Sequence, residues 1–195
     1  MKLDKRQKIL DTALSLFVEH GFYSASTANI AKHAGVATGT LFHHFPTKNA
    51  LLEELLTTVK QEFSDYVLHD SNVIIASADE DVKTRAETIW FAGLEWAVNH
   101  PQKLQLFFEF SQLQQIQGLL GNTKSRNLLS FLYLLIETGM QQEIFKPYSQ
   151  ELLAEWCHSQ FLSSARYLVT QPEPNIDEVK QITFTLFWDG IVKHH

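Results

Sequence analysis

Apolar residues recur at helical spacing from the start of the chain. Five of them stand three or four positions apart: Ile9, Leu10, Ala13, Leu14 and Phe17. This spacing places them on one face of a helix from about Asp4 to His20. Gly21 follows directly and suits the left-handed residue that ends many helices. The pattern therefore predicts a helix that buries one face.

Two shorter helical patterns follow, separated by a glycine turn. The first begins at Ser26 or Thr27, either of which can cap a helix, and it ends before Gly35. The second covers residues 38–45 and ends before a proline. Because helices of this length are not stable alone, we expect all three helices to pack together. The tight turn makes the second and third a helix-turn-helix.

The helical period continues almost to the end of the chain. Further helices are expected at 50–68, between the acidic residues 79–81 and a break at 100–101, and at 102–117, 123–141, 149–170 and 175–192. The expected breaks are 118–121, 146–147 and 172–174, which hold glycine or proline. Strand-like alternation and internal repeats are missing from the sequence. It therefore predicts an all-α protein.

Charge divides the chain into two unequal parts. Residues 1–48 hold six Lys and Arg against three Asp and Glu, a net charge of +3. Residues 49–195 hold ten Lys and Arg against 19 Asp and Glu, a net charge of −9. A basic part beside an acidic one indicates a polyanion-binding end. We therefore expect a DNA-binding domain at 1–48 and a helical ligand-binding and dimerisation domain at 49–195.

Composition and motifs exclude several classes of protein. The chain has 195 residues, 45% of them hydrophobic, which is enough for a full core. We expect a cytoplasmic protein without membrane association, because the sequence has neither a long uncharged apolar run nor a signal peptide. Cys157 is the single cysteine, so we expect a buried thiol and no disulfide or cysteine-based zinc site. Phosphate-binding glycine loops and nucleophile motifs are also missing, and we expect neither catalysis nor a cofactor.

The helix at 38–45 carries the candidate DNA chemistry. If Leu41 and Phe45 face inward, the outer face holds Thr38, Gly39, Thr40, Phe42 and His43. Thr hydroxyls can hydrogen-bond base edges, Gly permits close approach, and Phe can pack on thymine methyl groups. The alternative is an ordinary helical turn, in which two adjacent histidines are simply solvated. A metal site is disfavoured, because His43 and His44 diverge by about 100° on a helix.

Residues 9–56 carry a resemblance to a known family. They read ILDTALSLFVEHGFYSASTANIAKHAGVATGTLFHHFPTKNALLEELL. The sequence is similar to the DNA-binding domain of the tetracycline-repressor (TetR) family of bacterial transcriptional regulators. Its marks are the LF-x-x-HG-F end of the first helix, the IA-x-x-AGV core of the second, and GTL-F-HHF-x-x-K. The resemblance implies an all-α homodimer whose variable C-terminal domain binds a small ligand.

The resemblance also implies the residues that contact DNA. They are Thr27, Thr38, Gly39, Thr40, Phe42, His43, His44 and Lys48. Three positions depart from the commonest family pattern. Ala37 stands where a serine usually caps the recognition helix, Thr38 where a lysine is common, and Phe42 where a tyrosine is usual. We expect Thr38 to take over the lost cap.

An aromatic-rich stretch at 90–116 is the candidate ligand site. We expect Trp90, Trp96 and Phe107 to wall an apolar pocket of the kind found between helices. Polar contacts would come from Glu95, Glu109, Gln112 or Gln115. The alternative is an ordinary aromatic core. No cation-rich segment is present there, so the expected ligand is small and apolar.

The last two helices are apolar on more than one side, which exceeds what a single surface helix buries. We expect the second apolar face to meet a second copy as a four-helix bundle, with Trp156, Phe161, Phe184 and Trp188 in the dimer interface. The sequence thus predicts a dimeric repressor that binds a palindromic operator and leaves it on binding an apolar ligand. The alternative is a DNA-binding protein whose effector is another protein.

Overall fold

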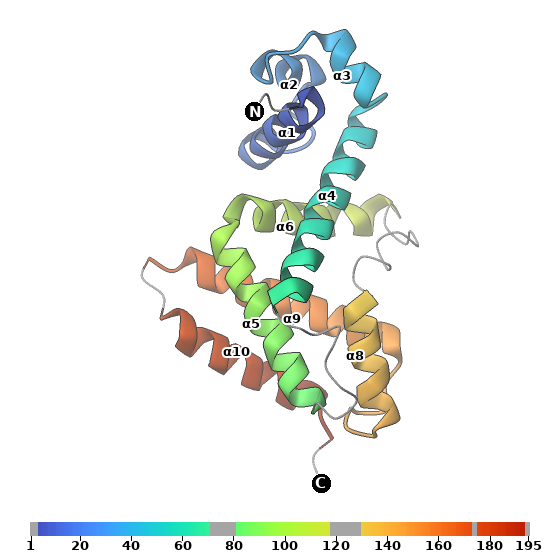
Figure 1. Ribbon diagram of the computed structural model, residues 1–195, viewed down its shortest axis with the longest axis vertical. Helices are drawn as coiled ribbons and strands as arrows, with labels where there is room; N and C mark the ends of the chain where they lie inside the picture. Colours follow the sequence, from blue (N-terminus) through green and yellow to red (C-terminus); the bar gives the residue numbers. More distant parts are fainter. Residues whose placement is uncertain (1–3, 71–80, 118–129, 173–174, 194–195) are drawn as a thin grey trace. The chain divides into compact units, whose positions relative to one another are not determined.

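The computed structural model describes residues 4–70, 81–117, 130–172 and 175–193, without the side chains of 69–70 and 110–117 (Figure 1). Every regular element in these ranges is a helix, and Phe145 and Val192 form an isolated antiparallel bridge. The helices are α1 (Lys5–His20), α2 (Thr27–His33), α3 (Thr38–His44), α4 (Lys48–Asp70), α5 (Val82–Asn99), α6 (Pro101–Gln117), α8 (Ser130–Gln141), α9 (Gln150–Thr170) and α10 (Ile176–Ile191). The all-α prediction is confirmed.

Several predicted features lie outside the described residues. These are the break at 118–121, residues 123–129 of the 123–141 helix, Asp79 and Glu80, and the 173–174 part of the last break. Asp81 is described and is the N-cap residue of α5, although its side chain accepts no capping hydrogen bond.

The chain forms two compact units. The first comprises the described parts of 1–61 and 102–119, and the second those of 62–101 and 120–195. Helix α4 supplies residues to both. The expected domain boundary at residue 48 differs from this division and stays a prediction.

The first unit contains α1, α2 and α3 around a shared apolar core. The predicted stripe of α1 is buried in full, with Ile9, Ala13 and Phe17 inaccessible to solvent. Ile30 of α2 and Leu41 of α3 are equally buried. Each short helix gains its stability from this packing, since neither is long enough to persist alone.

The turn between α2 and α3 depends on one glycine. Gly35 has φ +67°, in the left-handed region. Its N–H donates to the Lys32 carbonyl at 3.2 Å, and the Val36 N–H donates to the Ala31 carbonyl at 3.0 Å. These two bonds satisfy carbonyl groups at the end of α2 and form a Schellman motif. The turn therefore fixes where α3 begins.

The second unit is built on α5, which packs against α8, α9 and α10 (Figure 1). Aromatic rings fill much of its interior. Trp90 of α5 stacks on Phe187 of α10 with ring centroids 4.5 Å apart, and Phe63 of α4 meets Trp96 edge-on at 5.1 Å. Such pairs add stabilisation beyond the area that they bury.

Alanine substitutions at Gly35 and Gly39 should change the free energy of unfolding in opposite directions. Gly35→Ala should lower the free energy of unfolding by about 1–2 kcal/mol, because alanine in a left-handed conformation is strained. Gly39→Ala, inside α3, should raise it by up to about 1 kcal/mol through helix propensity. An added Cβ meets no atom within 4 Å at either position. New side-chain contacts therefore do not contribute to the difference between the two variants. Urea denaturation measures both, and equal effects would contradict this account of the turn.

Candidate functional site

The surface of α3 follows the predicted orientation. Leu41 is fully buried in the core, and Phe45, which follows the helix, is buried as well. The candidate residues differ in exposure: Thr38, Gly39, Phe42 and His43 are exposed, and Thr40 and His44 are half-buried. The structure thus brings together six of the predicted DNA-binding residues on one short helix.

The starts of α2 and α3 differ in how they are capped. The Ser26 hydroxyl accepts the Asn29 N–H at 3.1 Å, so Ser26 caps α2 and Thr27 is its half-buried first residue. Ala37 occupies the N-cap position of α3, where no side chain accepts a capping bond. The expectation that Thr38 provides the cap is wrong, because Thr38 already lies inside the helix. Helix α3 begins only with backbone bonds, such as the Thr40 N–H to the Ala37 carbonyl at 2.8 Å.

The two adjacent histidines end α3. Their rings meet edge-on with centroids 5.5 Å apart. Among the described residues, no cluster of three or more His, Cys, Asp and Glu side chains has the geometry to hold a metal ion.

Lys48, at the start of α4, has partners within its own unit. Its ammonium donates to the Tyr23 carbonyl at 3.3 Å and lies 4.5 Å from the ring centroid of Phe22. Partial burial lowers the pKa of Lys48 below its ordinary value. Lys48 therefore ties α4 to the turn after α1, a role that the sequence analysis missed because the contact joins residues 25 positions apart.

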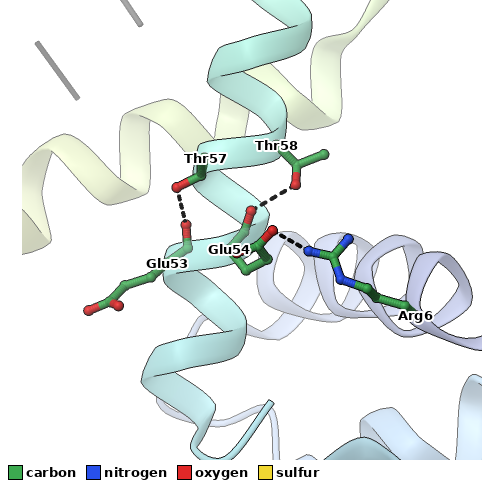
Figure 2. A network of polar contacts seen from close by, with 5 residues as sticks. All are labelled: Arg6, Glu53, Glu54, Thr57 and Thr58. Atoms are coloured by element: carbon green, nitrogen blue, oxygen red, sulfur yellow. Dashed lines mark hydrogen bonds and ion pairs between the residues drawn. The ribbon is translucent and has the colours of Figure 1, made fainter. Parts of the chain in front are cut away.

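Arg6 links α1 to the same helix. Its guanidinium pairs with the Glu54 carboxylate of α4 and lies 5.7 Å from the ring centroid of Phe45. Both charged side chains are half-exposed, so the pair itself stabilises the fold by at most about 1 kcal/mol. Figure 2 shows the pair with two neighbouring bonds at 2.8 Å, from the Thr57 hydroxyl to the Glu53 carbonyl and from the Thr58 hydroxyl to the Glu54 carbonyl.

A small cavity of about 70 Å³ lies within the second unit. Aromatic rings make up much of its wall, including Phe63, Trp90, Phe131, Phe161 and Phe187, and Cys157 and His158 are polar members of the wall. The indole N–H of Trp90 donates to the Thr183 hydroxyl at 3.1 Å. The cavity is therefore mostly apolar, with its tryptophan held in a fixed orientation.

Of the three predicted ligand residues, one lines the cavity. Trp90 lines the cavity, but Trp96 does not: it is buried against Phe63 and stacks on His100, with ring centroids 5.0 Å apart. Phe107 belongs to the other compact unit. Of the four expected polar contacts, Glu95 pairs with Lys180 at 3.4 Å, Glu109 accepts from Gln105 at 3.2 Å, and the side chains of Gln112 and Gln115 lie outside the described residues.

Three of the four predicted interface residues are used inside the subunit. Phe184 is only 2% exposed and Trp188 is also buried, with their rings stacked 5.9 Å apart. Phe161 packs edge-on against Trp90 at 6.0 Å. The packing of Phe184 and Trp188 leaves little of their surface for a partner and counts against their predicted place in a dimer interface, whereas Phe161 is half-buried and its place there stays a prediction. Trp156 is 46% exposed, and its place in a dimer interface stays a prediction.

Other apolar residues occupy the exposed faces of α9 and α10. Ile182 and Leu186 stand one turn apart and are 52% and 69% exposed, and Leu152 and Tyr167 of α9 are exposed as well. Tyr167, Ile182 and Leu186 line an open groove of about 580 Å³. The four-residue spacing of Ile182 and Leu186 was the sequence signal that could have found this face.

Within the described ranges, no helix combines the length and the apolar character needed to cross a bilayer.

Comparison with known proteins places this chain among transcriptional regulators. Residues 9–55 match the family model "Bacterial regulatory proteins, tetR family". A crystal structure of a tetR family transcription regulator from Shewanella sp. PV-4 is 39% identical, with a TM-score of 0.81 over 98% of this chain and 100% of that one. The HTH-type transcriptional regulator BetI of Escherichia coli O17:K52:H18 is 36% identical over 135 residues, 68% of each chain. YhgD of Bacillus subtilis, also named as an HTH-type regulator, is 26% identical over 79% of this chain and 78% of that protein.

The Cys157 thiol should report on the closure of the cavity. Burial raises its pKa to about 12, from an ordinary value of 9.0, which lowers the thiolate fraction about 1000-fold near pH 8. The folded protein should therefore react with an aromatic disulfide reagent at least about 100-fold more slowly than the protein in urea, and the rate should keep rising above pH 9. No other cysteine contributes to the signal. Equal rates in the folded and unfolded states would show that the cavity is open.

Proposed function

The chain belongs to the tetR family of bacterial regulatory proteins, and we propose that it represses transcription by binding a two-fold symmetric operator as a homodimer. Membership makes it a helix-turn-helix transcriptional regulator. The dimer, the operator and the release of DNA by a small apolar ligand are parts of the proposal. The absence of catalysis and the cytoplasmic location also stay predictions.

The orientation of α3 carries the DNA-binding proposal. Leu41 is buried in the core, and Thr38, Gly39 and Phe42 of the same helix are exposed to solvent. In a helix-turn-helix the second helix enters the major groove, and its early residues meet base edges. A hydroxyl, a glycine and an exposed aromatic ring can hydrogen-bond, approach closely and pack on a thymine methyl group.

Thr38→Ala should reduce sequence discrimination rather than general DNA affinity. Loss of one base-edge contact per subunit should weaken operator binding about five- to tenfold per subunit and leave binding to random duplex nearly unchanged. The operator is obtained by selection from a random duplex pool, and anisotropy measures both affinities. Thr84→Ala, an exposed threonine of α5, is the matched control. Equal weakening on both duplexes would show that Thr38 contacts the DNA backbone rather than a base.

The exposed face of α9 and α10 supports the dimer. Leu186, Ile182 and Trp156 leave apolar surface uncovered in one subunit. A second copy related by a two-fold axis would cover the same face on both subunits. The resulting pair of helices from each subunit would form a four-helix bundle.

Leu186→Asp should dissociate the dimer without unfolding the subunit. The carboxylate would be buried in the interface of the dimer but solvated in the monomer, at a cost of several kcal/mol to association only. Gln181→Asp is the control, because Gln181 is exposed on the same helix about 140° from Leu186. Sedimentation velocity and circular dichroism measure the two effects. A dimer that persists in folded Leu186→Asp protein would remove this face as the interface.

The small cavity of the second unit is the proposed ligand site. Its rings favour an apolar ligand, but ligand pockets commonly hold about 300–1,000 Å³, well above the 70 Å³ of this cavity. Ligand entry therefore requires the surrounding helices to separate, which provides a route to a second conformation. Linkage requires that ligand and DNA weaken each other's binding by the same factor.

The small volume of this cavity also supports the alternative, in which the effector is a protein rather than a small molecule. The two possibilities differ in tryptophan fluorescence, because Trp90 lines the cavity. An apolar inducer should quench the fluorescence with lower affinity in the presence of operator and should slow Cys157 labelling. Quenching with the same affinity in both conditions would favour a protein effector.

A further inference from the structure

We propose that Tyr23 is an additional contact to the DNA backbone and that Lys48 is the residue that positions it. The inference rests on the proposed operator binding and extends the DNA-binding surface beyond α2, α3 and the start of α4. The partner is the sugar-phosphate backbone of duplex DNA, beside the major groove that α3 would enter.

Tyr23 is the most exposed large hydrophobic side chain in the described part of the helix-turn-helix unit. It lies in the turn between α1 and α2 and is 70% exposed. The side chain is nevertheless held in place. Its ring meets Phe22 edge-on at 5.4 Å, and Phe22 meets the buried Phe17 edge-on at 5.4 Å. Three successive rings thus run from the core to the surface and end at Tyr23.

Lys48 fixes the backbone of the same turn. Its ammonium binds the Tyr23 carbonyl at 3.3 Å and lies over the Phe22 ring at 4.5 Å. Lys48 is the first residue of α4 and follows the end of α3 by only four positions. The turn is therefore tied to the start of α4, the helix that follows α3 in the chain.

The chemistry of the turn suits phosphate groups. Four hydroxyl-bearing residues stand within five positions: Tyr23, Ser24, Ser26 and Thr27. Ser26 caps α2, and Tyr23, Ser24 and Ser26 are all exposed. Hydroxyl groups of serine, threonine and tyrosine are frequent donors to phosphate oxygens, which position a protein on the duplex without reading sequence. A carboxylate is missing from residues 20–48, so no negative side chain of this segment repels the backbone.

The contacts of Lys48 indicate different roles for Lys48 and Tyr23. An ammonium that binds a carbonyl and a ring inside the unit orients the turn, and Tyr23 presents the exposed group. Loss of Lys48 should therefore remove most of the contribution of Tyr23 as well.

The test measures operator and random-duplex binding by anisotropy over a range of salt concentrations. Tyr23→Ala should weaken binding about three- to tenfold on both duplexes, and Tyr23→Phe should reproduce most of this loss. The dependence of affinity on salt should keep its slope, because a neutral side chain releases no counterion. Tyr148→Ala is the matched control, since Tyr148 is an exposed tyrosine of the second unit.

Two further measurements test the location of the Tyr23 contact on the DNA and the role of Lys48. Methylphosphonate substitution of single phosphates should identify a position that weakens binding of the unaltered protein but not of Tyr23→Ala. In Lys48→Met protein, Tyr23→Ala should cause less than about a twofold further loss. Lys48→Arg keeps the charge and should restore part of the coupling. Circular dichroism confirms that each variant is folded.

The outcomes separate this inference from the proposed function. If the unaltered protein selects no operator, the proposed function fails. If it binds an operator and Tyr23→Ala binds equally well, only the Tyr23 contact is wrong. A loss confined to the operator would overturn the backbone assignment, and fully additive losses in the double variant would overturn the positioning role of Lys48.

Discussion

Burial of Leu41 is the constraint on which the DNA-binding surface depends. Helix α3 has seven residues and no side-chain cap, so its position comes from packing rather than from its own stability. One buried leucine, with Phe45 buried just after the helix, decides which side faces the core. The burial of Leu41 leaves Thr38, Gly39 and Phe42 exposed on the same short helix.

Helix α4 is connected to this small core by two cations. Lys48 holds the turn after α1, and Arg6 of α1 reaches both Glu54 and the ring of Phe45. Each contact alone is weak, because its members are partly exposed. Together they join α1, the end of α3 and the first turns of α4. A displacement of the start of α4 would therefore alter contacts that reach the turn after α1 and Phe45, the residue that follows α3.

Local patterns predicted the helix-turn-helix well. The stripe from Ile9 to Phe17, the glycine turn and the inward Leu41 are all set by residues close in sequence, and periodicity and turn chemistry report on such features. The exposed face of α3 followed from the same reasoning. The cap at Thr38 failed because the sequence does not show at which residue a short helix begins.

Contacts between residues far apart in the sequence determine the features that the sequence did not predict. Helix α10 has two apolar faces, and the sequence does not show which one the subunit buries. Phe184 and Trp188, which the subunit buries, were therefore predicted in the dimer interface, whereas the exposed Ile182 and Leu186 were not. Trp90 and Trp96 lie six positions apart on one helix, yet only Trp90 reaches the cavity. The role of Lys48 depends on a carbonyl 25 residues away, which no local pattern reports.

Hydroxyl-radical footprinting of an operator, recovered from the genomic DNA fragments that the protein retains, tests the central claim most directly. A dimer that places two copies of α3 in successive major grooves should protect two equivalent backbone patches related by two-fold symmetry. Their centres should lie about one helical turn, or 34–36 Å, apart. A single asymmetric patch, or uniform protection without a preferred site, would contradict the account.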